Sequence, residues 1–148
     1  MAGLYFEQFD IGRRFTTGGR TITDADLVLF SGLSGDFTRL HLDEEYARKQ
    51  MFGGRVGHGM LGASIATGLI TQLGTMEDTA LGLLEFTCRF TGPLRPGDTV
   101  HVVQTVVEKK ETSKPDRGII TFGLELANQN SERVFSGEEK IMIRRLGR

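Results

Sequence analysis

The sequence lacks several features that would place a protein in a specialised class. It contains one cysteine, Cys88, so no disulfide can form within the chain, which is typical of a reducing compartment. Its formal net charge is −1 and it has no long basic run, so we expect no binding to nucleic acid. With 39% hydrophobic and 25% charged residues, the composition is that of an ordinary globular protein.

Long hydrophobic runs are also absent. The longest apolar stretch, from Met60 to Leu73, is too short for a membrane span and contains Ser64, Thr67 and Thr71. The first residues have neither the basic region nor the long apolar run of a signal peptide. We therefore expect a cytoplasmic protein that makes no contact with a membrane.

Proline is scarce and glycine abundant, with 3 and 20 residues respectively among 148. The length is that of one domain with a substantial core, and we expect residues 1–148 to form a single domain. Apolar periodicity is retained along the chain. The glycines therefore indicate tight turns and close backbone contacts rather than disorder.

The first helix has a clear start signal. Thr23 and Asp26 have the spacing of a capping box, and Ile22 and Leu27 occupy the positions of a hydrophobic staple. The pattern predicts a helix that begins here and ends near Gly35.

Residues 36–42 are predicted to form a loop, and Asp43 to cap a short helix over residues 44–50. Residues 58–73 are predicted to form the main helix. Its apolar residues cover most of the circumference, so we expect it to be buried on nearly all sides.

The second half of the chain predicts strands. Residues 84–90 alternate between apolar and polar side chains, and further strands are expected over residues 99–107, 119–127 and 134–144, with a short one at 9–17. Residues 108–117 are predicted to form a polar hairpin loop. Sequential strands with short connections predict an antiparallel meander. Only this sheet is large enough to cover the main helix, so we expect an α+β fold in which a curved sheet wraps a long helix.

A carboxylate and an imidazole, Asp36 and His41, lie five residues apart, and His58-Gly59 opens the main helix. An acid and a base at this spacing can orient and deprotonate one water molecule. The amide of Gly59 lies in the first helical turn, where N–H groups lack helical partners and the helix dipole is positive. That amide is suited to stabilising an oxyanion.

Three segments together resemble the MaoC-like hydratase family, which has the hotdog fold and includes the (R)-specific enoyl-CoA hydratases. They are GDFTRLHLD (35–43), FGGRVGHGML (52–61) and FTGPLRPGD (90–98). The resemblance implies a hydro-lyase that adds water reversibly to a trans-2-enoyl thioester and gives a (3R)-hydroxyacyl thioester. It implies acyl-CoA or acyl carrier protein thioesters as substrates and no cofactor. The family pairs two sheets side by side, and an exposed sheet edge is normally paired, so we expect a homodimer or a multiple of dimers.

The resemblance also assigns residues. Asp36 and His41 match the catalytic pair, and Gly59 matches the glycine whose amide holds the thioester carbonyl. Thr38 and Arg39 replace the family's Asn-Pro. Thr38 can bond locally to the backbone, as asparagine would. Arg39 can meet a carrier phosphate or a second substrate carboxylate, as in a dicarboxylic acyl-CoA, or can be a solvated loop arginine.

Other polar residues have two interpretations each. Ser64 and Thr67 can line an acyl tunnel, or can bond to carbonyls within their own helix. His58 is expected to brace the start of the main helix rather than to act in catalysis. We expect no metal site from His41, Asp43 and His58, because their spacing matches no helical metal motif.

Three functions are compatible with this sequence. The first is the hydratase or dehydratase reaction. The second is a hotdog thioesterase in which Asp36 activates water against the thioester carbonyl carbon. The third is a non-catalytic subunit that binds acyl thioesters. Because both Asp36 and His41 are present, the sequence favours the first.

Overall fold

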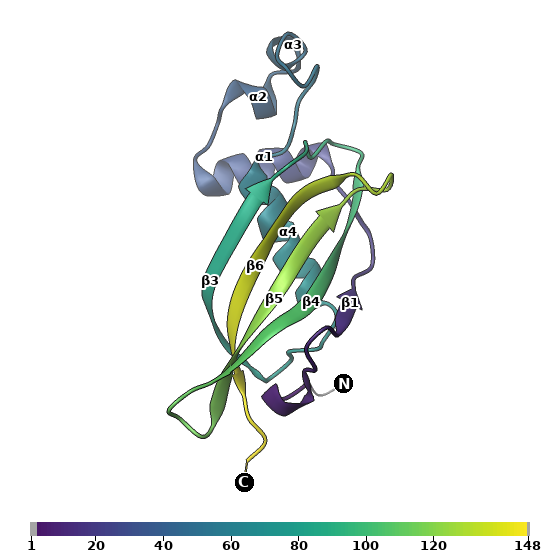
Figure 1. Ribbon diagram of the computed structural model, residues 1–148. Coiled ribbons are helices and arrows are strands. Elements are labelled where there is room, and N and C mark those ends of the chain that lie inside the picture. The colour runs from purple at the N-terminus through teal and green to yellow at the C-terminus, as the bar shows by residue number, and fades with distance from the viewer. Residues whose placement is uncertain (1–2, 148) are drawn as a thin grey trace.

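The protein has an α+β architecture in which a curved antiparallel sheet wraps one long helix (Figure 1). The structure is a computed structural model that describes residues 3–147, so residues 1, 2 and 148 of the expected domain lie outside the described residues. The elements in chain order are η1 (Phe6–Gln8), β1 (Arg14–Thr16), β2 (Arg20–Thr21), α1 (Asp24–Ser34), α2 (Arg39–Leu42), α3 (Glu44–Ala47), α4 (Gly59–Thr71), β3 (Ala80–Phe90), β4 (Thr99–Glu111), β5 (Arg117–Ala127) and β6 (Arg133–Arg144).

The start and end of α1 confirm the expectations from the sequence. Thr23 and Asp26 form a reciprocal capping box, in which each side chain accepts a hydrogen bond from the other residue's backbone N–H. Ile22 and Leu27 are both buried. Gly35 ends the helix with a φ of 78°, a left-handed conformation that glycine adopts without a steric penalty.

The sheet has the strand order β1-β4-β5-β6-β3, with β2 also pairing with β4, and every pairing is antiparallel. Strands β4, β5 and β6 form the expected meander. The expectation was wrong for β3, which pairs with β6 at the far edge instead of with β4. Strands that follow one another in the chain pair readily when a tight turn joins them. Strands β3 and β4 are instead joined by residues 91–98, which carry the chain past β6 and β5.

Strand lengths also differ from expectation. The strand expected at residues 9–17 is limited to β1, and β2 was not anticipated. The expected loop at 108–117 was wrong, because β4 continues to Glu111 and β5 begins at Arg117. Here the ladder extends past the core, so the strand residues are polar although their backbones are paired.

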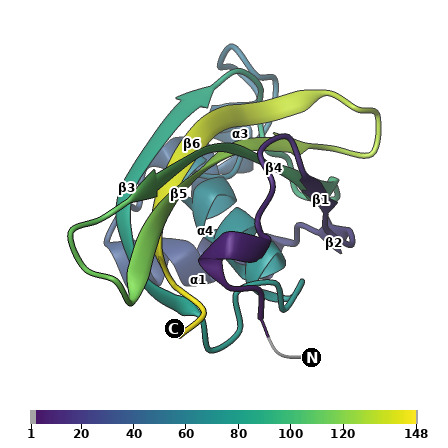
Figure 2. The same ribbon diagram turned by 60° about the horizontal axis from the view of Figure 1, so that its bottom comes forward.

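The core lies between α4 and the concave face of the sheet, and Figure 2 shows the strands curving around the helix. From β5, alternate residues Ile120, Phe122, Leu124 and Leu126 are buried against it, as expected. From α4, the buried residues include Leu61, Ile65, Ala66, Leu69 and Ile70.

Helix α4 matches its expected position closely, but the expected burial on nearly all sides was wrong. Met60 is 59% exposed, and Ser64, Thr67 and Thr71 are also exposed. The sheet curves around one side of α4 only, so the other side stays open. Among residues 3–147, no helix is both long enough and apolar enough to cross a membrane.

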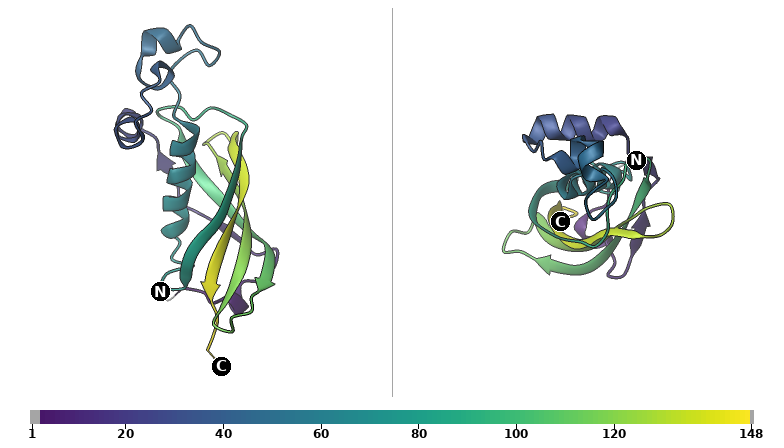
Figure 3. Two further views of the ribbon diagram at one scale, coloured as in Figure 1. Left: turned by 90° about the vertical axis from the view of Figure 1, so that its left-hand side faces the viewer. Right: turned by 90° about the horizontal axis from the view of Figure 1, so that it is seen from above.

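Residues 36–58 lie beyond the start of α4, at one end of the molecule (Figure 3). The expected loop at 36–42 contains one helical turn, α2, closed by a bond from the Asp43 amide to the Arg39 carbonyl. Asp43 then caps α3, as expected, through its side chain and the Tyr46 amide, but α3 ends at Ala47. This end of the molecule holds Asp36, His41 and His58.

Candidate active site

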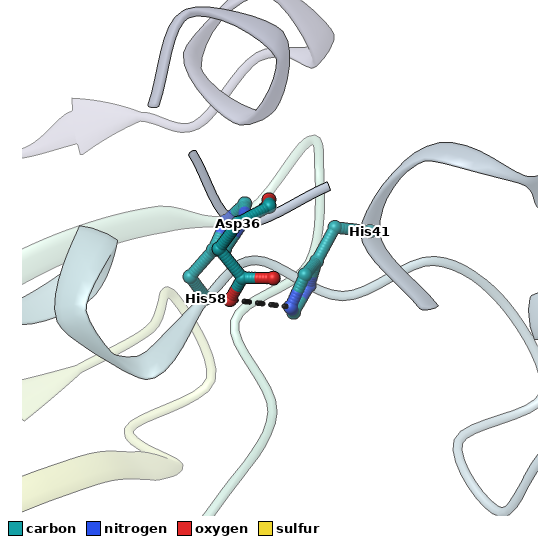
Figure 4. Close-up of side chains that lie close together, drawn as sticks. All are labelled: Asp36, His41 and His58. Carbon is teal, nitrogen blue, oxygen red and sulfur yellow. Dashed lines mark hydrogen bonds and ion pairs between the residues drawn. The ribbon is translucent and has the colours of Figure 1, made fainter. Parts of the chain in front are cut away.

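The end of α1, the turn α2 and the start of α4 converge on one cluster of three side chains. Asp36 follows the left-handed cap Gly35, His41 belongs to α2, and His58 is the last residue before α4. Figure 4 shows the carboxylate of Asp36 and the ring of His41 facing one another, with His58 beside them. The fold therefore brings together the two residues that the sequence pairs.

Hydrogen bonds from Thr38 hold the carboxylate of Asp36. Its Oδ1 accepts bonds from the Thr38 hydroxyl at 2.6 Å and from the Thr38 amide at 3.1 Å. These bonds favour the ionised form and are the main cause that lowers the pKa of Asp36 below its ordinary value, with smaller contributions from His58 and His41. The side chain of Asp36 is 48% exposed, and its Oδ2 points toward His41.

His41 is buried and is held through its other ring nitrogen. Its Nδ1 lies 2.7 Å from the carbonyl oxygen of Val56, which can only accept, so Nδ1 carries the proton and donates. Nε2 then has a free lone pair, and it lies 3.9 Å from Oδ2 of Asp36. This separation is too long for a hydrogen bond. Two acceptor atoms at this distance can both bind the hydrogens of one small molecule between them.

His58 packs against this pair. Its ring stacks on the ring of His41, with centroids 3.7 Å apart and 25° between the planes, and its centroid lies 4.9 Å from that of Phe30. Its Nε2 lies 3.0 Å from the backbone oxygen of Asp36 and 3.3 Å from Oγ of Ser31. The expected bracing of the helix start is not made, because the His58 side chain forms no capping bond. Instead, His58 joins α1 to α4.

The three side chains of this cluster are also of types that can ligate a metal ion. Ligand atoms of Asp36, His41 and His58 lie within 4.8 Å of one another. The set that included Asp43 is not formed, because Asp43 caps α3 and pairs with Arg39. Stacked imidazole rings direct their lone pairs along nearly parallel planes, whereas a metal ion needs ligands that converge on one point.

A cavity of about 390 Å³ opens beside the cluster. His41, His58 and Gly59 line it together with apolar side chains that include Phe90 and Leu94. A Cβ on Gly59 would lie 2.9 Å from a ring carbon of Phe90, so this position has no room for a side chain. The first turn of α4 therefore presents backbone to the cavity.

The amide of Gly59 belongs to the first turn of α4, where N–H groups have no partner within the helix and the dipole is positive. His41 and Gly59 line the same cavity. An imidazole ring and the first backbone amide of the helix therefore open onto one space with mostly apolar walls.

Arg39 lies outside this arrangement. Its guanidinium pairs with Asp43 at 2.8 Å and stacks over the ring of Tyr46 at 4.3 Å. Both contacts are on the surface of α2 and α3, and Arg39 does not line the cavity that holds His41. The structure thus gives no support to a substrate contact by Arg39.

Ser64 and Thr67 both bond to their own helix, to the carbonyls of Met60 and Ala63. They face different surroundings. Ser64 lies in a shallow hollow against α1, whereas Thr67 lines a second cavity between α4 and β3.

Two contributions were not foreseen from the sequence. The hydroxyl of Thr38 bonds to the carboxylate of Asp36, where a bond to backbone was expected. A threonine two residues after an aspartate is a signal for such a turn. The carbonyl of Val56, which orients His41, carries no signal in the sequence because any residue has a carbonyl.

Comparisons with known proteins agree with this geometry. Residues 7–127 match the family described as "MaoC like domain". The Protein MaoC of Klebsiella aerogenes is 40% identical over 113 residues, which cover 76% of this chain and 33% of that protein, so this chain spans about a third of its length.

An (R)-specific enoyl-CoA hydratase of Rhodospirillum rubrum is 31% identical over 140 residues, which cover 94% of this chain and 91% of that protein. The crystal structure of a MaoC-like dehydratase from Rhodospirillum rubrum superposes with a TM-score of 0.90 at 31% identity, over 99% of this chain and 100% of that one. The family match and these two full-length similarities confirm the resemblance seen in the motifs. The chain therefore belongs to the MaoC-like domain family and has its hotdog fold.

Proposed function

We propose that this protein is an enoyl thioester hydratase, a hydro-lyase that adds water reversibly to a trans-2-enoyl-CoA or acyl carrier protein thioester. The product is the (3R)-hydroxyacyl thioester. The observation that carries the proposal is the 3.9 Å separation of two acceptor atoms, Nε2 of His41 and Oδ2 of Asp36, beside the cavity that Gly59 lines. The relative named as an (R)-specific enoyl-CoA hydratase supports the same reaction.

The two acceptors divide the work on one water molecule. Asp36 has a lowered pKa and is a weak base, so it orients the water by accepting one of its hydrogens. Nε2 of His41 has a free lone pair and takes the other hydrogen as the water oxygen attacks C3. The same nitrogen then returns the proton to C2. Both atoms of the added H–OH reach one face of the double bond, which is syn addition.

Negative charge develops on the thioester oxygen as C3 is attacked. The Gly59 amide at the positive end of α4 is placed to donate a hydrogen bond to that oxygen. One such donor lowers a barrier by about 3 kcal/mol. The base and the donor come from separate elements, so the fold sets their distance.

The direct test follows crotonyl-CoA with the purified protein, by enoyl absorbance and by release of free thiol. We expect loss of the enoyl signal without thiol release, and Asp36→Asn and His41→Ala should each lower kcat/KM by roughly 100-fold to 10,000-fold. Release of free thiol in step with loss of the absorbance would instead indicate a thioesterase, because hydrolysis also destroys the conjugated thioester.

His101→Ala is the matched control, because His101 lies on β4 away from this cavity and should leave hydration unchanged. Thermal unfolding of each variant checks that the fold is intact. Full activity of Asp36→Asn or His41→Ala would remove that residue from the mechanism.

Thr38→Val should raise the pKa of Asp36, because it removes the hydroxyl donor but keeps the amide donor. The carboxylate is then protonated at a higher pH than in the wild type. Carboxyl ¹³C NMR titration measures this directly, with Thr38→Ser as the control that restores the hydroxyl. An unchanged titration of Asp36 would show that the hydroxyl bond is not formed in solution.

The Gly59 amide can be tested with two variants that differ in that N–H. In a Phe90→Ala background, which makes room for a Cβ, Gly59→Ala keeps the donor and Gly59→Pro removes it. Proline is tolerated at the first helical position, and His58 already has the extended conformation that precedes proline (φ −57°, ψ 141°). We expect kcat for crotonyl-CoA to be about 100-fold lower with proline. Equal rates would exclude this amide as the oxyanion donor.

The protein should also be a homodimer that pairs through β3. Strand β3 bonds to β6 along one edge, and Leu81, Leu83 and Leu84 are 37–56% exposed, a long apolar edge of the kind that is normally covered. Leu84→Glu should shift the mass in light scattering from dimer to monomer. Val28→Glu, an equal change at an exposed residue of α1, is the control. A monomeric wild type would contradict this assignment.

A further inference from the structure

A pair of polar side chains lies in the apolar core, far from Asp36 and His41. Glu139 of β6 and Gln104 of β4 both occupy inward-facing positions, and they are 4% and 0% exposed. Nε2 of Gln104 donates a hydrogen bond of 2.9 Å to Oε1 of Glu139. The residues at neighbouring inward positions, such as Val102 and Ile141, are apolar.

This pair is incompletely satisfied. Oε1 of Gln104 is buried and has no hydrogen-bond partner among the described residues. Glu139 forms no ion pair within residues 3–147. Burial raises the pKa of Glu139, and the bond from Gln104 only partly opposes this effect. The oxygens of the Glu139 carboxyl can accept further hydrogen bonds. A polar pair without its full set of hydrogen bonds lowers the stability of an apolar core. Its presence therefore indicates a role other than stabilising the fold.

Glu139 lines a cavity of about 320 Å³ between α4 and β3. Thr67 and Ile70 of α4 and Leu81 and Leu83 of β3 line it too. Apart from Glu77 and Glu139, its wall is formed by uncharged residues, so it contains no positive side chain.

This cavity and the one at Gly59 lie on the same side of α4. Thr67 and Ile70 follow Gly59 by eight and eleven residues, which places all three on one helix face. The distance along the axis from Gly59 to Thr67 is about 12 Å. The two ends of β3 also line the two cavities, Phe90 the first and Leu81 the second. An acyl group that is held by its thioester at Gly59 and follows α4 would reach Glu139 at medium chain length.

We propose, on the basis of the proposed hydration, that Glu139, held in place by Gln104, recognises an uncharged hydroxyl group at the distal end of a medium-chain enoyl thioester. A hydroxyl can donate a hydrogen bond to a carboxyl oxygen of Glu139, which lines the cavity. A methyl end supplies no such donor, so the carboxyl keeps only its bond from Gln104, which is unfavourable in a buried site. A distal carboxylate meets two acidic side chains and no cation. A dicarboxylic substrate is therefore disfavoured in this cavity. Arg39 offers it no support either, because its guanidinium pairs with Asp43.

The test compares three substrates of equal chain length, 10-hydroxy-trans-2-decenoyl-CoA, trans-2-decenoyl-CoA and trans-2-decenedioyl-CoA. For the wild type we expect kcat/KM for the hydroxy substrate to exceed that for the alkyl substrate about tenfold, with the dicarboxylic substrate slowest. Glu139→Leu should abolish or reverse the preference. The measured quantity is the ratio of kcat/KM values, in which any general loss of activity cancels.

Glu138→Gln is the matched control, because Glu138 is the neighbouring residue of β6 on the exposed face and should keep the preference. Glu139→Gln, of nearly the same volume, serves if the leucine variant fails to fold, and should weaken the preference. Equal rates on hydroxy and alkyl substrates, or a preference that survives in Glu139→Leu, would overturn this proposal while hydration of crotonyl-CoA upholds the proposed function. A wild type that hydrates none of these thioesters would overturn both.

Discussion

Burial of one side of α4 in the concave sheet is the constraint on which the rest of this structure depends. The helix supplies Leu61, Ile65 and Leu69 to the core, and the strands supply alternate residues that pack around them. Because only one side is covered, the helix also keeps an open face. The closed side provides stability, and the two cavities lie near the two ends of α4, where residues of β3 also line them. The position of α4 therefore sets the geometry of everything that a substrate can meet.

His58 links this core to the cluster that contains Asp36 and His41. It stands between α1 and α4, touches the backbone of Asp36 and stacks on His41. Its ring thereby brings two segments of the chain into contact. The carbonyl of Val56 then orients the ring of His41. The ring of His41 is thus held by buried contacts, while the carboxylate of Asp36 stays partly accessible.

The two ends of α4 have different roles in the proposed function. At the first turn, backbone amide and imidazole act on the thioester and its double bond. Two turns further on, Glu139 and Gln104 interrupt an otherwise apolar sheet face. Glu139 lines the cavity between α4 and β3, and in the proposed function it meets the distal end of the substrate. One helix would in this way separate the reaction from substrate selection.

Sequence patterns alone predicted the α+β class, the wrapped helix, the capping box at Thr23 and the family, because these depend on local periodicity and on motifs with definite spacing. They also paired Asp36 with His41. Four further features became apparent only in the folded chain: the pairing of β3 with β6, the open face of α4, the stacking of His58 on His41 and the contact between Glu139 and Gln104. These features join residues that are distant along the chain. Their contacts depend on how the sheet curves and on which edge each strand occupies, and neither leaves a periodic signal in the sequence.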